Sequence, residues 1–224
     1  MTGKRPASDS DAIWRVIAEQ RAVLADLLDE LSDDQWRQPS LCDGWTVRDV
    51  AAHLTLQQLG LRDLIATMAN WRGSMDRTIQ DAARRRAAEL STARIVAEIR
   101  ATAGLRRHTL GVTYLETLTD ILIHSQDIAI PLGLRHEMPP DAAAVAADRV
   151  LSMRWPPQLP AARKVAGFRL TATDLSWSTG AGPEVRGPMS ALLLICAGRR
   201  AALPRLSGEG AGDLAARLGV SSTR

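Results

Sequence analysis

The sequence predicts a protein of the α+β class, in which an N-terminal bundle of four helices precedes a small C-terminal α/β domain. Three observations carry this prediction. Apolar residues recur at helical spacing through the first two thirds of the chain. The proline-dense stretch RWPPQLPAARK then interrupts this pattern. After it, apolar and polar residues alternate as they do in β-strands.

The helices of the first domain follow from apolar spacing and from capping residues. A cap at Ser10 or Asp11 opens the first helix, and Ser32 caps a short turn that ends at Trp36. The last helix of the bundle ends before Pro131 and Gly133. The expected longer helices cover residues 47 to about 71, 78–103 with a break near Ser91, and 113–130.

The remaining elements define the second domain and its boundary. A fifth helix, 141–153, completes a first domain that we expect to span residues 1–154, and residues 155–165 form a proline-rich linker. The second domain then covers residues 166–224. Three strands are expected in GFRLTATD, LSWSTG and PEVRG, followed by a buried helix that begins at Pro188 and a terminal helix in GAGDLAARLG.

The composition is typical of a soluble cytoplasmic protein. The chain has 224 residues, of which 46% are hydrophobic, and a net charge of +3. No apolar run approaches the roughly 20 residues that span a bilayer, and no apolar signal core precedes the first helix, so we expect no membrane partner. Only Lys4 and Lys164 are lysines, and this arginine bias is typical of a GC-rich genome such as that of an actinobacterium.

The arginine run and the cysteines argue against two further classes of protein, namely nucleic-acid-binding proteins and proteins held together by disulfides or cysteine-rich metal knuckles. Arg84, Arg85 and Arg86 form a dense basic run without interleaved aromatic residues, which indicates a solvated face rather than a nucleic-acid site. Cys42 and Cys196 belong to no CxxC pair, so neither a disulfide framework nor a cysteine-rich metal knuckle is expected. We interpret both as small packed hydrophobic residues, without a catalytic role for Cys42.

The stretch LCDGWTVRDVAAHL combines a tight turn with a helix start. Gly44 permits the turn, and Thr46 with Asp49 resembles a capping box. Trp45 could pack back onto the helix against Val50 as a hydrophobic staple. The motif therefore fixes the direction of a helix that carries His53 in its second turn.

Three residues form a candidate metal site. Asp120 and His124 are four residues apart and lie on one face of the fourth helix, and His53 is the natural third ligand. Inward-facing imidazoles and a carboxylate on apolar helices need compensation for lost hydration, and a cation provides it. Two alternatives remain: hydrogen-bonded core histidines, and Glu116 as the carboxylate, although it lies two turns from His124.

Polar neighbours of these residues are candidates to orient the histidines. Asp49 and Gln57 flank His53 at four residues on either side, and Glu116 and Asp127 flank the Asp120 and His124 pair. Ligating histidines usually donate their second ring N–H to a carboxylate or carbonyl, so each of these side chains could serve. The sequence leaves the choice open.

The two motifs together resemble a known family. LCDGWTVRDVAAHL with LTDILIHSQDIAIPLG is similar to the N-terminal domain of the mycothiol-dependent maleylpyruvate isomerase family, a branch of the DinB-like metal-binding four-helix bundles. The segment from GFRLTATD to LSGEG resembles that family's small C-terminal domain. The resemblance implies a divalent metal, with zinc expected, held by His53, Asp120 and His124. The isomerases commonly have Glu where this chain has Asp120, so the shorter carboxylate must approach more closely or bind with different denticity.

The resemblance also implies an arginine from the C-terminal domain. Arg199, in CAGRRAALPRLSGEG, is our choice as the catalytic arginine, with Arg200 and Arg205 as alternatives. A planar guanidinium suits a carboxylate-bearing substrate because it binds both oxygens. The competing interpretation is an ordinary solvent-facing arginine.

The function implied is that of a metal-dependent enzyme with mycothiol as cosubstrate. Two neutral histidines and one carboxylate leave a zinc centre with an open position, where a small thiol would be held as thiolate and attack an electrophilic small molecule. The outcome would be isomerisation or S-transfer. Two other functions remain open: a non-catalytic metal-binding or ligand-binding module, and a metal-dependent hydrolase. The sequence makes no prediction of the oligomeric state.

Overall fold

The structure is a computed structural model, and it describes residues 8–56, 73–108, 111–153 and 159–219. The chain divides into two compact units, Met1–His136 and Glu137–Arg224, which we describe separately. The predicted fold class is confirmed, because the described part is mostly helical and ends in a unit with a small β-sheet. None of the helices described is long and apolar enough to cross a membrane.

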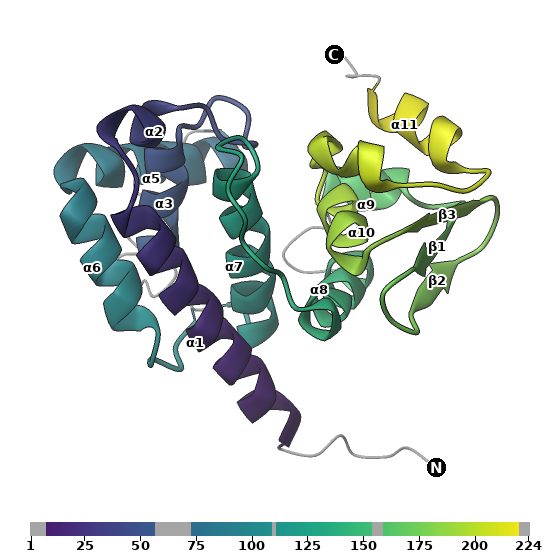
Figure 1. Cartoon of the computed structure of the whole chain (residues 1–224), viewed down its shortest axis with the longest axis horizontal. Helices are drawn as coiled ribbons and strands as arrows, with labels where there is room; N and C mark the ends of the chain where they lie inside the picture. The colour runs from purple at the N-terminus through teal and green to yellow at the C-terminus, as the bar shows by residue number, and fades with distance from the viewer. Residues whose placement is uncertain (1–7, 57–72, 109–110, 154–158, 220–224) are drawn as a thin grey trace. The chain divides into compact units, whose positions relative to one another are not determined.

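The first unit is a helical bundle (Figure 1). Helix α1 packs against α6 and α7, and α3 packs against α5, α6 and α7. Buried aliphatic residues from all of these helices except α5 fill the centre, where α5 contributes buried alanines. The helices are α1 (Ser8–Asp29), α2 (Asp33–Arg37), α3 (Val47–Thr55), α5 (Met75–Glu89), α6 (Thr92–Thr102) and α7 (Tyr114–Ala129).

Capping side chains set several helix boundaries, and the predicted cap at Ser32 is confirmed. Ser32 and Thr113 form capping boxes at the starts of α2 and α7. Ser91 caps α6 and separates it from α5, so the expected break near this residue is confirmed. Helix α1 begins at Ser8, before the expected caps. The expected continuation of the helix from Val47 beyond residue 56 lies outside the described residues, as far as residue 72.

The basic run on α5 joins elements of the first unit. Arg84 Nη2 donates a hydrogen bond to the carbonyl of Gly44 at 2.7 Å. Arg86 donates to Glu98 on α6 at 2.6 Å and to Thr55 on α3 at 3.3 Å. Arg84 and Arg85 are exposed, as expected of a solvated face, whereas Arg86 is half-buried. Arg84 and Arg86 in addition join elements of the unit, which the sequence did not predict.

The second unit packs helices on a small sheet. Among the described residues, three strands form the sheet in the order β2-β1-β3, with β1 antiparallel to β2 and parallel to β3. Helix α10, which is buried along its whole length apart from Ser190, packs on β1, β3 and α8. The elements are α8 (Pro140–Ser152), α9 (Pro160–Lys164), β1 (Arg169–Ala172), β2 (Ser178–Gly180), β3 (Glu184–Gly187), α10 (Met189–Cys196), the 3-10 helix η1 (Arg200–Arg205) and α11 (Ala211–Gly219).

The boundary between the units differs from the one expected near Arg154. The boundary along the chain lies between His136 and Glu137. Helix α8 belongs to the second unit because it buries its alanine face against α10. Part of the expected linker, residues 160–164, forms the short helix α9, which begins at Pro160. The proline content of this stretch had indicated a linker. The 3-10 helix η1, which contains Pro204, was not predicted from the sequence.

Candidate metal centre

Three side chains from two helices converge in the first unit. His53 of α3 and Asp120 and His124 of α7 offer ligand atoms that all lie within 4.8 Å of one another. His53 Nε2 lies 3.4 Å from Asp120 Oδ2, and His124 Nε2 lies 3.2 Å from Asp120 Oδ1. The two imidazole rings meet edge to face, with centroids 5.0 Å apart. All three residues that the sequence singled out are therefore neighbours.

Local structure explains this convergence. Asp120 and His124 lie one turn apart on α7, and α3 packs directly against α7. The start of α3 is fixed by the predicted capping box, in which Asp49 Oδ2 accepts hydrogen bonds from the backbone N–H and hydroxyl of Thr46, both at 2.8 Å. Gly44 enters this turn with φ at +74°, a left-handed conformation that favours glycine.

The carboxylate and the imidazoles of the cluster shift one another's pKa. Burial alone would raise the pKa of Asp120, but the charges and hydrogen bonds of His124 and His53 hold it well below the usual value. Burial alone would lower the pKa of His124, but Asp120, Asp127 and Cys42 together hold it well above the usual value. The metal-free cluster thus favours an ionised Asp120 beside a protonated His124, and a metal would displace that proton.

One of the candidate orienting residues contacts a ring nitrogen of the cluster. Asp127 Oδ2 lies 2.8 Å from His124 Nδ1, and its side chain is fully buried. Asp49 and Glu116 instead accept hydrogen bonds at the N-caps of α3 and α7. Gln57 lies outside the described residues. Asp127 is therefore the orienter that the geometry selects for His124.

The donor set fits a divalent metal. The Nδ1 atom of His53 is buried without a hydrogen-bond partner among the described residues, which indicates that this ring is not held as an ordinary core histidine. Two imidazoles and one carboxylate are ligands that zinc accepts in catalytic sites, which take three protein ligands and keep one position open. The exposed fractions of 17% for His53, 31% for Asp120 and 13% for His124 leave the cluster partly open to solvent.

Trp45 covers both histidines. Its ring meets His53 edge to face at a centroid distance of 5.4 Å and lies nearly parallel to His124, 6.5 Å away with an angle of 8°. The sequence predicted a staple between Trp45 and Val50 and did not predict these contacts. The position of Trp45 just before the cap of α3, on the side of the helix that carries His53, was the signal available.

Cys42 also reaches the cluster, which the sequence analysis did not predict. Its Sγ donates to Asp127 Oδ2 at 3.1 Å and lies 3.7 Å from His124 Nδ1. Cys42, His124 and Asp127 thus form a second group whose ligand atoms lie within 4.8 Å of one another. The interpretation of Cys42 as only a packed hydrophobic residue is therefore incomplete.

A buried arginine also acts on the cluster. Arg21 of α1 is 2% exposed, and its Nη1 donates to the carbonyls of Thr102 and Leu105 at 3.0 and 3.4 Å. Burial lowers the pKa of Arg21 to about 10, and the charge of Asp120 acts in the opposite direction. No sequence motif predicted this buried arginine, whose charge interacts with that of Asp120.

Arg199 lies in the second unit. It is half-buried where α10 leads into η1, and its Nη1 donates to the carbonyl of Ala197 at 2.7 Å. Of the two alternatives, Arg200 is exposed and Arg205 donates to the hydroxyl of Ser190 at 2.9 Å. The catalytic role of Arg199 remains a prediction.

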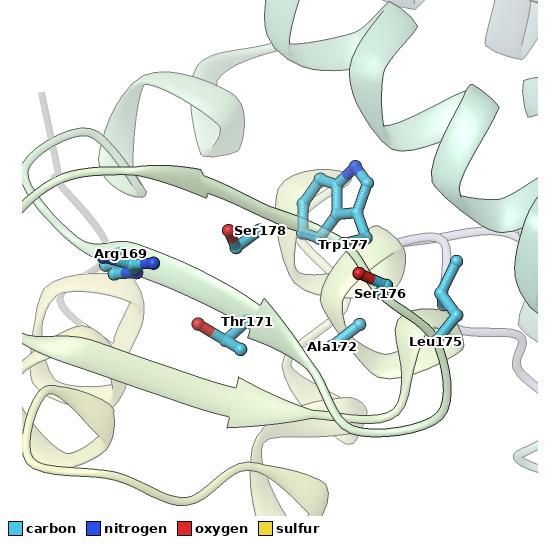
Figure 2. A pocket seen from close by; sticks show the side chains of 7 residues that line it. All are labelled: Arg169, Thr171, Ala172, Leu175, Ser176, Trp177 and Ser178. Atoms are coloured by element: carbon cyan, nitrogen blue, oxygen red, sulfur yellow. The ribbon is translucent and has the colours of Figure 1, made fainter.

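The second unit also contains a shallow pocket of about 260 Å³ along β1 and β2 (Figure 2). Two of its polar groups already have partners, because Thr171 donates to Glu184 at 2.8 Å and the Trp177 indole donates to Asp148 at 3.0 Å. The pocket is therefore a weaker candidate than the cluster in the first unit. Its lining residues are Arg169, Thr171, Ala172, Leu175, Ser176, Trp177 and Ser178.

The fold and the cluster define a class of protein: a helical bundle with a histidine and carboxylate cluster on facing helices, followed by a small α/β unit. Residues 17–116 match the family model of the mycothiol maleylpyruvate isomerase N-terminal domain. This match confirms the resemblance to that family that the N-terminal motifs indicated. The match includes His53 and ends before Asp120, so it leaves the ligands on α7 untested.

Two solved structures have a fold similar to that of this chain. A crystal structure of the mycothiol-dependent maleylpyruvate isomerase carrying a histidine-to-alanine substitution is 16% identical, with a TM-score of 0.54 over 90% of this chain and 93% of that chain. A crystal structure of the mycothiol-dependent maleylpyruvate isomerase is also 16% identical, with a TM-score of 0.50 over 84% and 89%. This likeness shows the fold alone. No curated protein sequence matches the chain.

Proposed function

We propose that this protein is a metal-dependent enzyme that uses a low-molecular-weight thiol, with mycothiol expected, to act on an electrophilic small molecule by isomerisation or S-transfer. One observation carries the proposal: the ligand atoms of His53, Asp120 and His124 lie within 4.8 Å of one another. The match of residues 17–116 to the family model of the mycothiol maleylpyruvate isomerase N-terminal domain supports the choice of a thiol.

The three side chains would hold one divalent ion, and zinc is the expected metal. A zinc ion bound there would supply a Lewis acid that keeps a thiol deprotonated at neutral pH. His53 and His124 would bind as neutral imidazoles, so the proton that His124 carries in the metal-free protein must leave. Asp127 would orient the His124 ring by accepting from Nδ1.

The chain's own cysteines are unsuited to act as the nucleophile, which favours an added thiol. Cys196 is completely buried, and burial raises the pKa of its thiol to about 12. The thiol of Cys42 donates a hydrogen bond to Asp127 on the Nδ1 side of His124, so it does not face the position proposed for the metal. A thiol cosubstrate also fits the cytoplasm, where thiols are kept reduced.

Arg199 is the proposed partner of a carboxylate on the substrate. The hydrogen bond to the carbonyl of Ala197 fixes one Nη of its guanidinium. A planar guanidinium suits a carboxylate because it can bind both oxygens. This assignment rests on the resemblance of CAGRRAALPRLSGEG to the C-terminal domain of the isomerases.

The test is a metal analysis and a thiol titration of the same purified samples. We expect about one zinc per chain and thiol-dependent protection of the metal from chelators in the wild-type protein. His53→Ala and His124→Ala should lose both. His108→Ala is the matched control, because His108 is exposed and lies outside the cluster. Wild-type metal content in both cluster variants would contradict the proposal.

The same samples distinguish the two alternative functions. Stoichiometric zinc without any thiol binding would favour a non-catalytic module. Zinc-dependent hydrolysis of esters or amides without added thiol would favour a hydrolase. Either result would overturn the thiol-dependent enzyme.

A further inference from the structure

The loop that carries Cys42 is tied to the end of α7. The backbone N–H of Leu41 donates to the carbonyl of Asp127 at 3.1 Å. Within the loop, the N–H of Trp45 donates to the carbonyl of Cys42 at 3.0 Å, and the N–H of Cys42 donates to the hydroxyl of Ser40 at 3.1 Å. These bonds place the thiol at a defined point beside the Asp127 side chain.

The Cys42 thiol and the His124 imidazole contact the same carboxylate oxygen of Asp127. Asp127 Oδ2 lies 3.1 Å from Cys42 Sγ and 2.8 Å from His124 Nδ1. A fully buried carboxylate depends on such donors for its position, because bulk solvent does not reach it. The S–H group is a weak donor, but here it fixes the oxygen that orients the histidine.

The geometry also separates the thiol from the metal position. Cys42 lies on the Nδ1 side of His124, whereas Asp120 lies on the Nε2 side. The two nitrogens of an imidazole point in different directions, so Cys42 belongs to the second group of residues and not to the group of His53, Asp120 and His124. It can therefore influence the metal without occupying the open position.

We infer that Cys42 is a positioning residue for the metal centre: its thiol holds the Asp127 carboxylate, which in turn holds the His124 ring with Nε2 directed at the metal. This inference rests on the proposed function and adds a residue to its site. It assigns a specific role to a cysteine that is neither a nucleophile nor a ligand.

The test compares Cys42→Ala with Cys42→Ser in the full chain, using Zn²⁺ with a competing chelator and Co²⁺ as a spectroscopic probe. Cys42→Ala removes the donor and should weaken zinc binding by about 10-fold, the lower end of the loss that follows removal of orienting partners. It should also change the visible spectrum of bound Co²⁺. Cys42→Ser keeps an O–H donor and should restore most of the affinity and the wild-type spectrum. Cys196→Ala, in the second unit, is the control and should match the wild type.

Three results would overturn the inference. The first is equal zinc affinity and an identical Co²⁺ spectrum in Cys42→Ala and the wild type. The second is failure of Cys42→Ser to restore the affinity when its metal-free form is as stable as the wild type. The third is a sulfur-to-cobalt charge-transfer band before any thiol is added, which would make Cys42 a ligand. A wild-type protein that binds no metal would overturn the proposed function as well, so the two failures are distinguishable.

Discussion

His124 and Asp127 are joined at 2.8 Å between Nδ1 and Oδ2, a contact between neighbouring turns of α7 that leaves Nε2 of His124 facing Asp120. Asp127→Asn keeps the shape of the side chain but removes the charge that stabilises the Nδ1 proton. We expect zinc affinity to fall by about 10- to 100-fold, measured by chelator competition.

Asp34→Asn is the control for this variant. Asp34 is exposed on α2 and pairs with Arg37 at the surface, so its substitution should leave zinc affinity unchanged. Equal affinities of Asp127→Asn and the wild type would contradict the assignment of Asp127 as the orienter.

Trp45 should support the metal centre through its contacts with both imidazoles. Trp45→Ala removes the ring that lies against His53 and His124, so zinc affinity and the free energy of unfolding should both fall. The loss of stability should be smaller than the roughly 3–5 kcal/mol typical of fully buried aromatic residues, because Trp45 is only half-buried. Trp45→Phe should retain more of both quantities.

Urea unfolding and chelator competition measure the two effects of Trp45. Trp177→Ala, in the second unit, is the matched control and should lower stability without changing zinc affinity. If the Trp45 and Trp177 variants had the same zinc affinity, Trp45 would have no part in the site.

The turn before α3 should depend on glycine. Gly44 has φ at +74°, and an added Cβ would meet only side-chain atoms at ordinary contact distances of 3.5 Å or more. Gly44→Ala should therefore cost about 1–2 kcal/mol of unfolding free energy from backbone strain alone. Gly104→Ala is the control, because Gly104 has no positive φ and open space around it. Equal stabilities of the two variants would contradict this account of the turn.

His136 should make the stability of the metal-free protein depend on pH. Its ring is buried, and burial lowers the pKa of the ring from 6.5 by more than the backbone of Gln20 raises it. The unfolded chain therefore binds a proton at a higher pH than the folded chain does. Stability from His136 is complete above about pH 6.5 and is lost as pH falls through the lowered folded-state pKa.

Urea unfolding of the wild type and of His136→Gln, both with chelator, isolates this contribution. The difference between their unfolding free energies should change as pH falls below about 6.5, with the wild type losing more stability than the variant. A difference that is constant with pH would show that His136 takes up its proton equally in the folded and unfolded states.

Arg199 should affect substrate binding and leave the metal unchanged. Arg199→Ala should raise KM for a carboxylate-bearing substrate, and Arg199→Lys should recover only part of the loss because lysine lacks the planar fork. Arg200→Ala, at the exposed neighbouring position, is the control. Unchanged kinetics in Arg199→Ala would show that Arg199 does not bind the substrate, and Arg205 would then be the next candidate.

The sequence predicted the parts of the site that depend on local periodicity. The spacing of Asp120 and His124 places them on one face of any helix, and the capping box of Thr46 and Asp49 is a contact within four residues. Both patterns can be read without knowing the fold. Pairing His53 with them required only that two apolar helices pack together.

The contacts that the sequence did not predict are long-range. Cys42 and Asp127 are 85 residues apart, and their hydrogen bond depends on how the loop before α3 docks on α7. The boundary near Arg154 was placed by proline content, whereas the compact units are set by the packing of α8 on α10. Neither arrangement has a periodic signature in the chain.

X-ray absorption at the zinc edge, before and after addition of a small thiol to the zinc-loaded protein, shows whether the metal accepts an external thiolate. We expect only nitrogen and oxygen ligands before addition, with histidine scattering, and one sulfur at about 2.3 Å after it. A sulfur ligand present before the thiol is added, or none after saturating thiol, would contradict a zinc centre that keeps a position open for an external thiolate.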